Sequence, residues 1–367
     1  MAPSDALFWY AEEALPQFRS TIAGLYVLEG VPEAERLDAA LDSAIALLPR
    51  LRQRVLDVPL HLGLPEWVDD PHFDRRYHLR HLSLAPPGDA RHLLDLAATL
   101  FATPLDHERP LWEATWIDGL EGGRSAYLFK MHHSMVDGVG SLAILNAITQ
   151  LAPDESIPRI ERRPPHRLPS AAEQLARLAR DNARHAIDRV GRAAASSVGA
   201  VERPREAMES VFSTWRGVRA MLADALQPAA RDPLSAGSAG ISRRFDVLDL
   251  SLERLRKLRA PLDATVNDLV LAALAGALAA YYRERGHSLD RLKCMVPMNL
   301  RGRDDRESMG NRVGMFNVLL PVGDEPPQER LRLVREQTRA AKQDQRGAAG
   351  PMFVEMFMAL PGGAFRW

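Results

Sequence analysis

The chain reads Lys-Met-His-His-Ser-Met-Val-Asp-Gly over residues 130–138. An apolar, strand-like run at 125–131 comes before the histidines, and an apolar, helix-like run at 141–148 follows them. His132 and His133 therefore fall where a buried strand ends and the chain turns towards a helix. Because α/β proteins place much of their chemistry at the ends of strands, we predict a functional site here, with His133 as a general base.

Two familiar uses of histidine do not fit this stretch. A zinc site needs three or four ligands, and neighbouring residues on a strand point to opposite faces. Cys294 is the single cysteine, and the chain contains no His-Glu-x-x-His helix pattern. The Gly-x-Ser-x-Gly elbow of serine hydrolases is also missing. We therefore predict no metal, with one histidine facing a reaction site and the other facing the packed interior.

Composition narrows the class of protein. The chain has 367 residues, of which 46% are hydrophobic and 26% are charged, as in ordinary globular proteins with more than one core. A formal net charge of -1 predicts no binding to nucleic acid. One cysteine suits a reducing compartment, and no apolar run reaches the ~18 residues of a membrane span. We expect a cytoplasmic protein.

The pattern of apolar residues predicts mixed α and β structure in two units. Helical spacing occurs at 33–48 and 89–102, and strand-like runs occur before, between and after these two segments. These strands are predicted at 21–30, 53–56, 66–68, 77–82, 112–117 and 125–131. A proline- and arginine-rich linker follows at 152–170. The helix expected at 171–192 is basic, so it suits either a crossover between units or contact with an anionic membrane.

The second unit is predicted to open with a strand at 242–250. A helix follows at 252–259, with Ser251 as its N-cap. The next helix, at 269–284, is apolar on all sides, which predicts full burial. Strands at 291–297 and 315–321 and an amphipathic surface helix at 329–343 complete the pattern.

The run His132-His133-Ser-Met-Val-Asp137-Gly138 resembles the active-site signature of the CoA-dependent acyltransferase superfamily. Other stretches narrow this resemblance to the bacterial wax ester synthase/diacylglycerol acyltransferase family. They are Pro110-Leu111-Trp112, Asn267-Asp268 before an apolar run, Val296 to Arg301, and Gly310-Asn311. The resemblance covers nearly the whole chain, and its motifs follow one another in the order of the family.

This resemblance implies an α/β fold of mixed sheets with two lobes, like that of chloramphenicol acetyltransferase, around a central tunnel. Residues 1–151 would form the N-terminal lobe, 152–240 the linker and crossover helices, and 241–367 the C-terminal lobe. The third motif reads Pro-Met-Asn at 297–299 where the family usually has Pro-Val-Ser. Family chains also normally continue well past the position of Trp367. We therefore expect a truncated C-terminal lobe.

The implied reaction joins a long-chain fatty acyl group from acyl-CoA to diacylglycerol or a long-chain alcohol, which gives triacylglycerol or wax ester. An imidazole, whose ordinary pKa is about 6.5, can take the hydroxyl proton as attack on the thioester begins. His133 would be this base. By resemblance His132 supports it, Asp137 fixes the turn, and Gly138 permits an unusual backbone conformation.

The remaining motif residues have less direct expected roles. Asn267 is the candidate donor to the tetrahedral oxyanion, with Asp268 beside it. An equally good interpretation is that Asn267 or Asp268 is the N-cap of the following helix. We expect Pro110-Leu111-Trp112 to be architectural and Gly310-Asn311 to shape a turn near the site.

Acyl-CoA is expected as a substrate, and no separate cofactor is predicted. The acceptor lipid suggests peripheral contact with the inner membrane or with lipid inclusions. Two other functions stay open from the sequence. One is a different superfamily enzyme that acts on a carrier-bound thioester, and the other is an inactive paralogue that only binds lipid.

Overall fold

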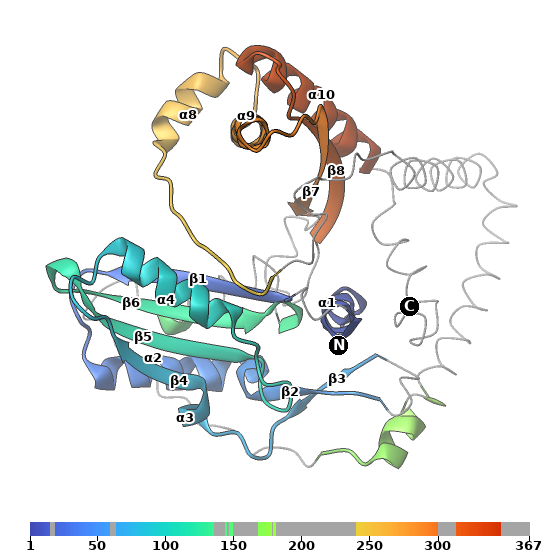
Figure 1. Cartoon of the computed structure of the whole chain (residues 1–367). Helices are drawn as coiled ribbons and strands as arrows, with labels where there is room; N and C mark the ends of the chain where they lie inside the picture. Colours follow the sequence, from blue (N-terminus) through green and yellow to red (C-terminus); the bar gives the residue numbers. More distant parts are fainter. Residues whose placement is uncertain are drawn as a thin grey trace, which may run out of the picture.

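The computed structural model describes most of the first 135 residues and two later stretches of the chain (Figure 1). The residues described are 1–14, 19–58, 64–135, 144, 147–149, 168–177, 179–180, 240–299 and 313–345. Among them, no helix has both the length and the apolar character to cross a membrane. The helix predicted at 171–192 is present at 171–177 and 179–180, and its remainder lies outside the described residues.

A four-stranded mixed sheet, in the order β1-β6-β5-β4, forms the centre of the first unit. Its strands are β1 (Thr21–Leu28), β4 (Leu79–Ser83), β5 (Trp112–Leu120) and β6 (Arg124–His132). Only β4 and β5 run parallel, and the other pairs are antiparallel. β5 and β6 form a hairpin closed by η3 (Glu121–Gly123), where Gly122 has a φ of 74° that suits glycine. The central strand β6 thus ends at the histidine pair.

Side chains of β6 alternate between two hydrophobic clusters, one on each face of the sheet. Phe129 and Met131 pack with α2 (Ala34–Leu47) in one cluster. Ala126 and Leu128 pack with α4 (Ala90–Ala102) in the other. Figure 1 shows α2 and α4 on opposite sides of the sheet. Because both faces are covered, the apolar residues of β6 form a continuous run from Ala126 to Phe129.

Smaller elements surround this sheet. They are α1 (Pro3–Ala14), η1 (Pro49–Arg52), the antiparallel pair β2 (Gln53–Leu56) and β3 (Glu66–Asp69), α3 (Arg75–His78) and η4 (His133–Met135). The strand predicted at 77–82 begins only at Leu79, because its first two residues complete α3. Asp74 caps that helix by accepting a hydrogen bond from the backbone N–H of Arg76.

The second unit consists of one β-hairpin covered by helices. It comprises α8 (Leu252–Arg259), α9 (Val266–Glu284), β7 (Arg291–Asn299), β8 (Val313–Pro321) and α10 (Pro327–Gln345). The two strands pair antiparallel. Their core joins Leu271 and Ala275 of α9 to Val318 of β8 and Val334 of α10. The prediction that α9 is buried on all sides is wrong, since Val270 is 45% exposed on the face away from this core.

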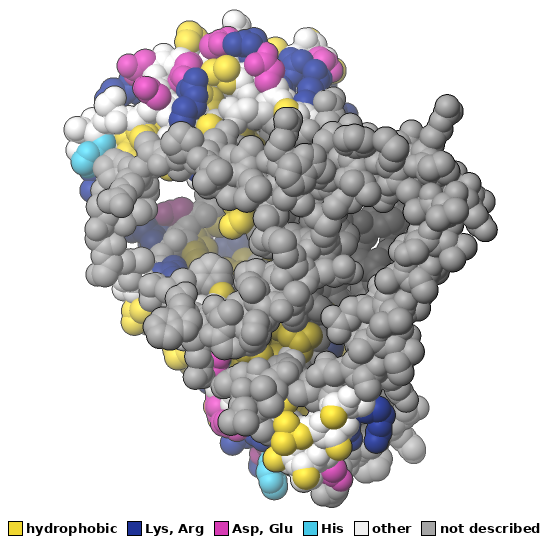
Figure 2. Space-filling model, turned by 90° about the vertical axis from the view of Figure 1, so that its right-hand side faces the viewer, with side chains coloured by type: hydrophobic (Ala, Val, Ile, Leu, Met, Phe, Trp, Pro, Cys, Tyr) yellow, Lys and Arg dark blue, Asp and Glu magenta, His cyan; other side chains and the backbone are white. Residues whose placement is uncertain are grey.

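The amphipathic surface helix predicted at 329–343 is confirmed as α10. On its outer face Arg332 forms ion pairs with Glu329 and Glu336, one helical turn away on either side. Basic and acidic side chains alternate on the upper part of the molecule in Figure 2, which contains this unit. Ser251 is confirmed as the N-cap of α8, because its hydroxyl accepts from the N–H of Arg254.

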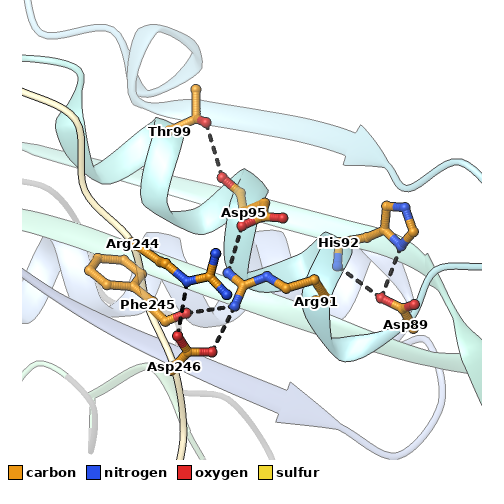
Figure 3. Close-up of polar contacts among 8 residues, drawn as sticks. All are labelled: Asp89, Arg91, His92, Asp95, Thr99, Arg244, Phe245 and Asp246. Atoms are coloured by element: carbon orange, nitrogen blue, oxygen red, sulfur yellow. Dashed lines mark hydrogen bonds and ion pairs between the residues drawn. The ribbon is translucent and has the colours of Figure 1, made fainter. Parts of the chain in front are cut away.

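The strand predicted at 242–250 is instead an unpaired, extended segment that lies on α4 of the first unit (Figure 3). Arg91 donates to the backbone oxygen of Phe245 at 2.9 Å and to the carboxylate of Asp246 at 2.8 Å. The ring of Phe245 meets Phe101 edge to face, with centroids 5.3 Å apart. Side-chain contacts rather than a backbone ladder therefore hold this segment. The sequence pattern alone does not distinguish such a segment from a paired strand.

Candidate active site

The histidine pair lies at the junction between β6 and η4, as the sequence predicts. His132 is the last residue of the strand and is 1% exposed, whereas His133 opens η4 and is half-buried. The two imidazoles thus differ in their access to solvent and to small molecules. Of the two, His133 is the one that a substrate can approach.

His132 is held in one tautomer by its neighbours. The backbone N–H of Ser134 donates to Nδ1 of His132 at 3.1 Å, and the hydroxyl of Ser134 lies 2.7 Å from the same nitrogen. Because an N–H can only donate, Nδ1 carries no proton and the proton sits on Nε2. Burial lowers the pKa of His132, and the nearby carboxylate of Glu12 opposes this change. His132 is therefore a neutral, fixed ring.

Helix α1 covers the histidine pair with three side chains on one face. Phe8 stacks on His133, with ring centroids 3.9 Å apart and an angle of 13° between the planes. Trp9 meets His132 edge-on at 5.9 Å. Glu12, one turn further along, reaches His132 with Oε2 at 3.3 Å from Nε2. Glu12 follows Trp9 by three residues and Phe8 by four, the spacings that place side chains together on a helix surface, so α1 directs all three towards the histidine pair.

Glu12 is the centre of a buried polar cluster that the sequence did not reveal. Its carboxylate lies 3.7 Å from Nε2 of His107 and 3.6 Å from Nη1 of Arg19, and it accepts from the N–H of Ser20 at 2.8 Å. Burial alone would raise the pKa of Glu12. Hydrogen bonding from His107, His132 and Ser20 outweighs burial and holds the pKa of this carboxyl well below its usual range.

Ser20 connects this cluster to the backbone of His133. The N–H of His133 donates to the carbonyl oxygen of Ser20 at 2.6 Å, just before β1 begins. The hydroxyl of Ser20 donates to the carbonyl oxygen of Phe8 at 2.9 Å. The start of β1, helix α1 and the histidine turn are therefore tied together. The sequence contained a signal for the Glu12 cluster. Glu12 lies in helical register with Phe8, and an acidic side chain on an apolar helix face needs polar partners.

The Pro110-Leu111-Trp112 motif occupies a buried place beside the pair. Leu111 and Trp112 are fully buried, and the carbonyl oxygen of Leu111 accepts from the N–H of His132 at 2.9 Å. The indole of Trp112 donates to the carbonyl oxygen of Leu51 at 2.8 Å and stacks on His78. These contacts are architectural in kind, because they join β5, β6 and η1.

Asn267 and Asp268 lie in the first turn of α9, and neither is its N-cap. Thr265 is the N-cap, and Asp268 completes a capping box by accepting from the N–H of Thr265 at 2.8 Å. The other oxygen of Asp268 accepts from the hydroxyl of Thr338 on α10 at 2.7 Å. Asp268 is thus buried and engaged within the second unit, whereas Asn267 is exposed.

Four predicted site residues lie outside the described residues. They are Asp137, Gly138, Gly310 and Asn311. In the described part of the chain, no group of three or more His, Cys, Asp or Glu side chains is arranged to hold a metal ion.

The fold places the chain in a known structural class. It is similar to the first condensation domain of the calcium-dependent antibiotic synthetase, with a TM-score of 0.59 and 18% identity over 93% of this chain and 74% of that one. It is also similar to the wax ester synthase/diacylglycerol acyltransferase of Marinobacter aquaeolei, with a TM-score of 0.60 and 23% identity over 100% of this chain and 78% of that one. The class is thus the two-lobed fold of chloramphenicol acetyltransferase, as predicted.

Sequence comparison then assigns the family. Residues 1–270 match the wax ester synthase/diacylglycerol acyltransferase catalytic domain, and residues 309–366 match the C-terminal domain of the same proteins. A Mycobacterium tuberculosis protein named diacylglycerol O-acyltransferase is 32% identical over 340 residues, which are 92% of this chain and 68% of that relative. The chain belongs to the wax ester synthase/diacylglycerol acyltransferase family and is an O-acyltransferase. The resemblance found in its motifs is confirmed.

Proposed function

We propose that the protein transfers a long-chain fatty acyl group from acyl-CoA to diacylglycerol or a long-chain alcohol, with His133 as the general base. The observation that carries this proposal is the contrast between the two histidines. His132 is buried and locked by Ser134, whereas His133 is half-buried at a strand end. Only an accessible imidazole can receive a proton from a bound alcohol.

The proposed reaction needs no acyl-enzyme. The alcohol oxygen attacks the thioester carbonyl carbon while His133 takes the hydroxyl proton. The tetrahedral intermediate then collapses, the carbon–sulfur bond breaks, and the imidazolium returns the proton to the departing CoA thiolate. The products are an ester and free CoA, and acyl-CoA is consumed as a substrate rather than held as a cofactor.

Other motif residues support this chemistry in the proposal. Asn267 is the candidate oxyanion donor, because its side chain is exposed and therefore available to a ligand. Asp268 supports Asn267 by holding the first turn of α9.

The lipid acceptor is supported by the relatives. The Mycobacterium tuberculosis relatives carry the name diacylglycerol O-acyltransferase, and the Marinobacter protein is named for both wax ester synthesis and diacylglycerol acylation. Such acceptors are poorly soluble, so the enzyme would meet them at a membrane or lipid-inclusion surface. Wild-type protein should therefore release CoA from palmitoyl-CoA in the presence of diacylglycerol or hexadecanol.

The test compares the wild-type protein with His133→Ala and His81→Ala. The base contributes about 10²- to 10⁴-fold to such reactions, so His133→Ala should lower kcat by at least ~100-fold. His81 is an exposed surface histidine paired with Asp118, so its removal should leave kcat unchanged. Released thiol and ester product are both measured. Absence of CoA release with either acceptor, or full turnover by His133→Ala, contradicts the proposal.

A further inference from the structure

Two routes of polar contacts lead from Glu12 to the chain on either side of the His133 imidazole. In the first route, Glu12 accepts from the N–H of Ser20 at 2.8 Å, and the carbonyl oxygen of Ser20 accepts from the N–H of His133 at 2.6 Å. In the second, Glu12 faces Nε2 of His132, and Nδ1 of that ring accepts from the N–H of Ser134 at 3.1 Å. The two routes bracket His133 along the chain.

Both routes start at the same oxygen of Glu12. Oε2 is the atom that accepts from Ser20 and the atom that lies 3.3 Å from His132. Oε1 faces His107 and Arg19, which belong to neither route. The side chain is only 7% exposed, so water cannot easily replace it as an acceptor. One buried carboxylate oxygen thus accepts from Ser20 and faces Nε2 of His132, and both of these residues lead to the histidine turn.

We propose that Glu12 is a positioning residue, which holds the turn at 132–134 and thereby aims the imidazole of His133 at the substrate. This inference rests on the proposed role of His133 as the general base. It extends a general arrangement in which the base of an active site is oriented by a further group. Glu12 reaches the base through Ser20 and His132 rather than by direct contact with the reacting atoms.

The turn needs such support because η4 is a single 3-10 turn of three residues at the end of a strand. Without the carboxylate, the backbone N–H of Ser20 would lose its buried acceptor, and the ring Nε2–H of His132 would lose the charge that faces it. His132 could then exchange its proton between Nε2 and Nδ1, which would break the bond from Ser134. A displacement of the catalytic group by 1 Å can cost about 10²-fold in rate.

The test measures kcat and KM for palmitoyl-CoA in Glu12→Ala and Glu12→Gln. We expect Glu12→Ala to lower kcat by about 10²-fold, the cost of a misplaced base, with little change in KM. Because both donors meet one oxygen, the carbonyl oxygen of a glutamine can serve both, so Glu12→Gln should recover most of kcat. Rescue by glutamine separates positioning through hydrogen bonds from a requirement for charge.

Glu113→Gln is the matched control for a general loss of stability. Glu113 is another carboxylate of this unit that is largely shielded from solvent, and it pairs with Nζ of Lys130 at 2.6 Å and with Arg80 at 2.9 Å. Its loss should lower the melting temperature about as much as Glu12→Ala does and leave kcat near the wild-type value. If Glu12→Ala lowers kcat no more than Glu113→Gln, or raises KM alone, the proposal is wrong.

A second measurement separates this proposal from the proposed function. Nitrogen-15 spectra of the histidine rings report tautomers without any turnover, with signals assigned through His132→Gln and His133→Ala. The wild type should show His132 protonated on Nε2, and Glu12→Ala should mix its tautomers and shift the His133 signals. Unchanged ring signals in Glu12→Ala overturn the positioning role. Full turnover by His133→Ala overturns only the proposed function.

Discussion

At the scale of single residues, the surroundings of His133 differ from what its motif alone suggests. The motif supplies the imidazole, but Phe8 covers one face of the ring at 3.9 Å between centroids. An aromatic face attracts a cation, and the proposed reaction places a positive charge on this imidazole when the alcohol proton arrives. Phe8 therefore faces the positive charge that the proposed reaction places on this ring.

We predict that Phe8→Leu lowers kcat by about 5- to 10-fold, because a stacked aromatic ring contributes on the order of 1 kcal/mol to a facing cation. Phe8→Tyr, which keeps the ring, should stay close to the wild type. Phe73→Leu is the control, since Phe73 stacks on His78 in the same unit. Steady-state rates of CoA release give kcat for each variant. Equal losses of kcat in Phe8→Leu and Phe73→Leu would contradict the prediction.

At the scale of elements, the start of α9 carries two roles that can be separated by mutation. Thr265 and Asp268 form a capping box, and Asp268 also accepts from the buried hydroxyl of Thr338 on α10. The carboxylate thus joins two helices of the second unit. Asn267, between them in sequence, is exposed and has the freedom to contact a ligand.

We predict that Asp268→Ala lowers the free energy of unfolding by roughly 1–3 kcal/mol, because it removes the capping-box acceptor of the Thr265 N–H and the carboxylate that accepts from the buried Thr338 hydroxyl. Thr265→Ala removes the cap alone and should cost about 1 kcal/mol. Urea unfolding of the purified variants gives both values.

Activity assays on the same variants separate stability from chemistry. Asn267→Ala should keep the stability of the wild type and lower kcat, because it removes only the candidate oxyanion donor. A removed donor of this kind typically costs about 10²- to 10³-fold in kcat. Normal turnover by Asn267→Ala would assign the motif to helix capping alone.

At the scale of the whole molecule, buried histidines link stability to pH. Burial lowers the pKa of His78 and of His132 below the ordinary value of 6.5. His78 donates from Nδ1 to the carbonyl oxygen of Trp112 at 2.8 Å, and within the described residues its Nε2 has no hydrogen-bond partner. Protonation of either ring therefore costs more in the folded chain than in the unfolded chain.

We predict that the free energy of unfolding is at its full value above pH 6.5 and falls as pH drops below it. In that range His78 and His132 bind protons more readily in the unfolded chain than in the folded chain, so the free energy of unfolding rises with pH. Urea midpoints between about pH 5 and pH 8 measure the slope. His78→Gln should flatten it, whereas the exposed His81→Gln should not. An unchanged slope in His78→Gln would contradict this account.

Glu12 causes a second loss of stability at lower pH. Its pKa is lowered from the ordinary value of 4.5, so it stabilises the fold above that value and loses this contribution as pH falls further. The contacts of His107, His132 and Ser20 with the carboxylate would weaken together. Loss of structure at the histidine turn is therefore expected before the whole unit unfolds in acid.

The sequence predicted much of the first unit because its elements leave periodic patterns. The apolar spacing of α2 and α4, the β5–β6 hairpin and the end of β6 at His132 could all be read from consecutive residues. The segment 242–250 could not, since its strand-like pattern does not say whether a neighbouring strand is there to pair with it. The burial of α9 was likewise overestimated, because its composition does not reveal that only one face meets a partner.

By itself, the sequence determined the mixed α/β class, the family and the place of His133 at the end of a strand. These follow from short-range periodicity and from motifs of a few adjacent residues. Only the tertiary structure decided that Glu12, Ser20 and Phe8 surround this histidine pair. They lie far from it along the chain, and contacts between distant segments depend on packing, so a local pattern can show that Glu12 needs partners but not which residues they are.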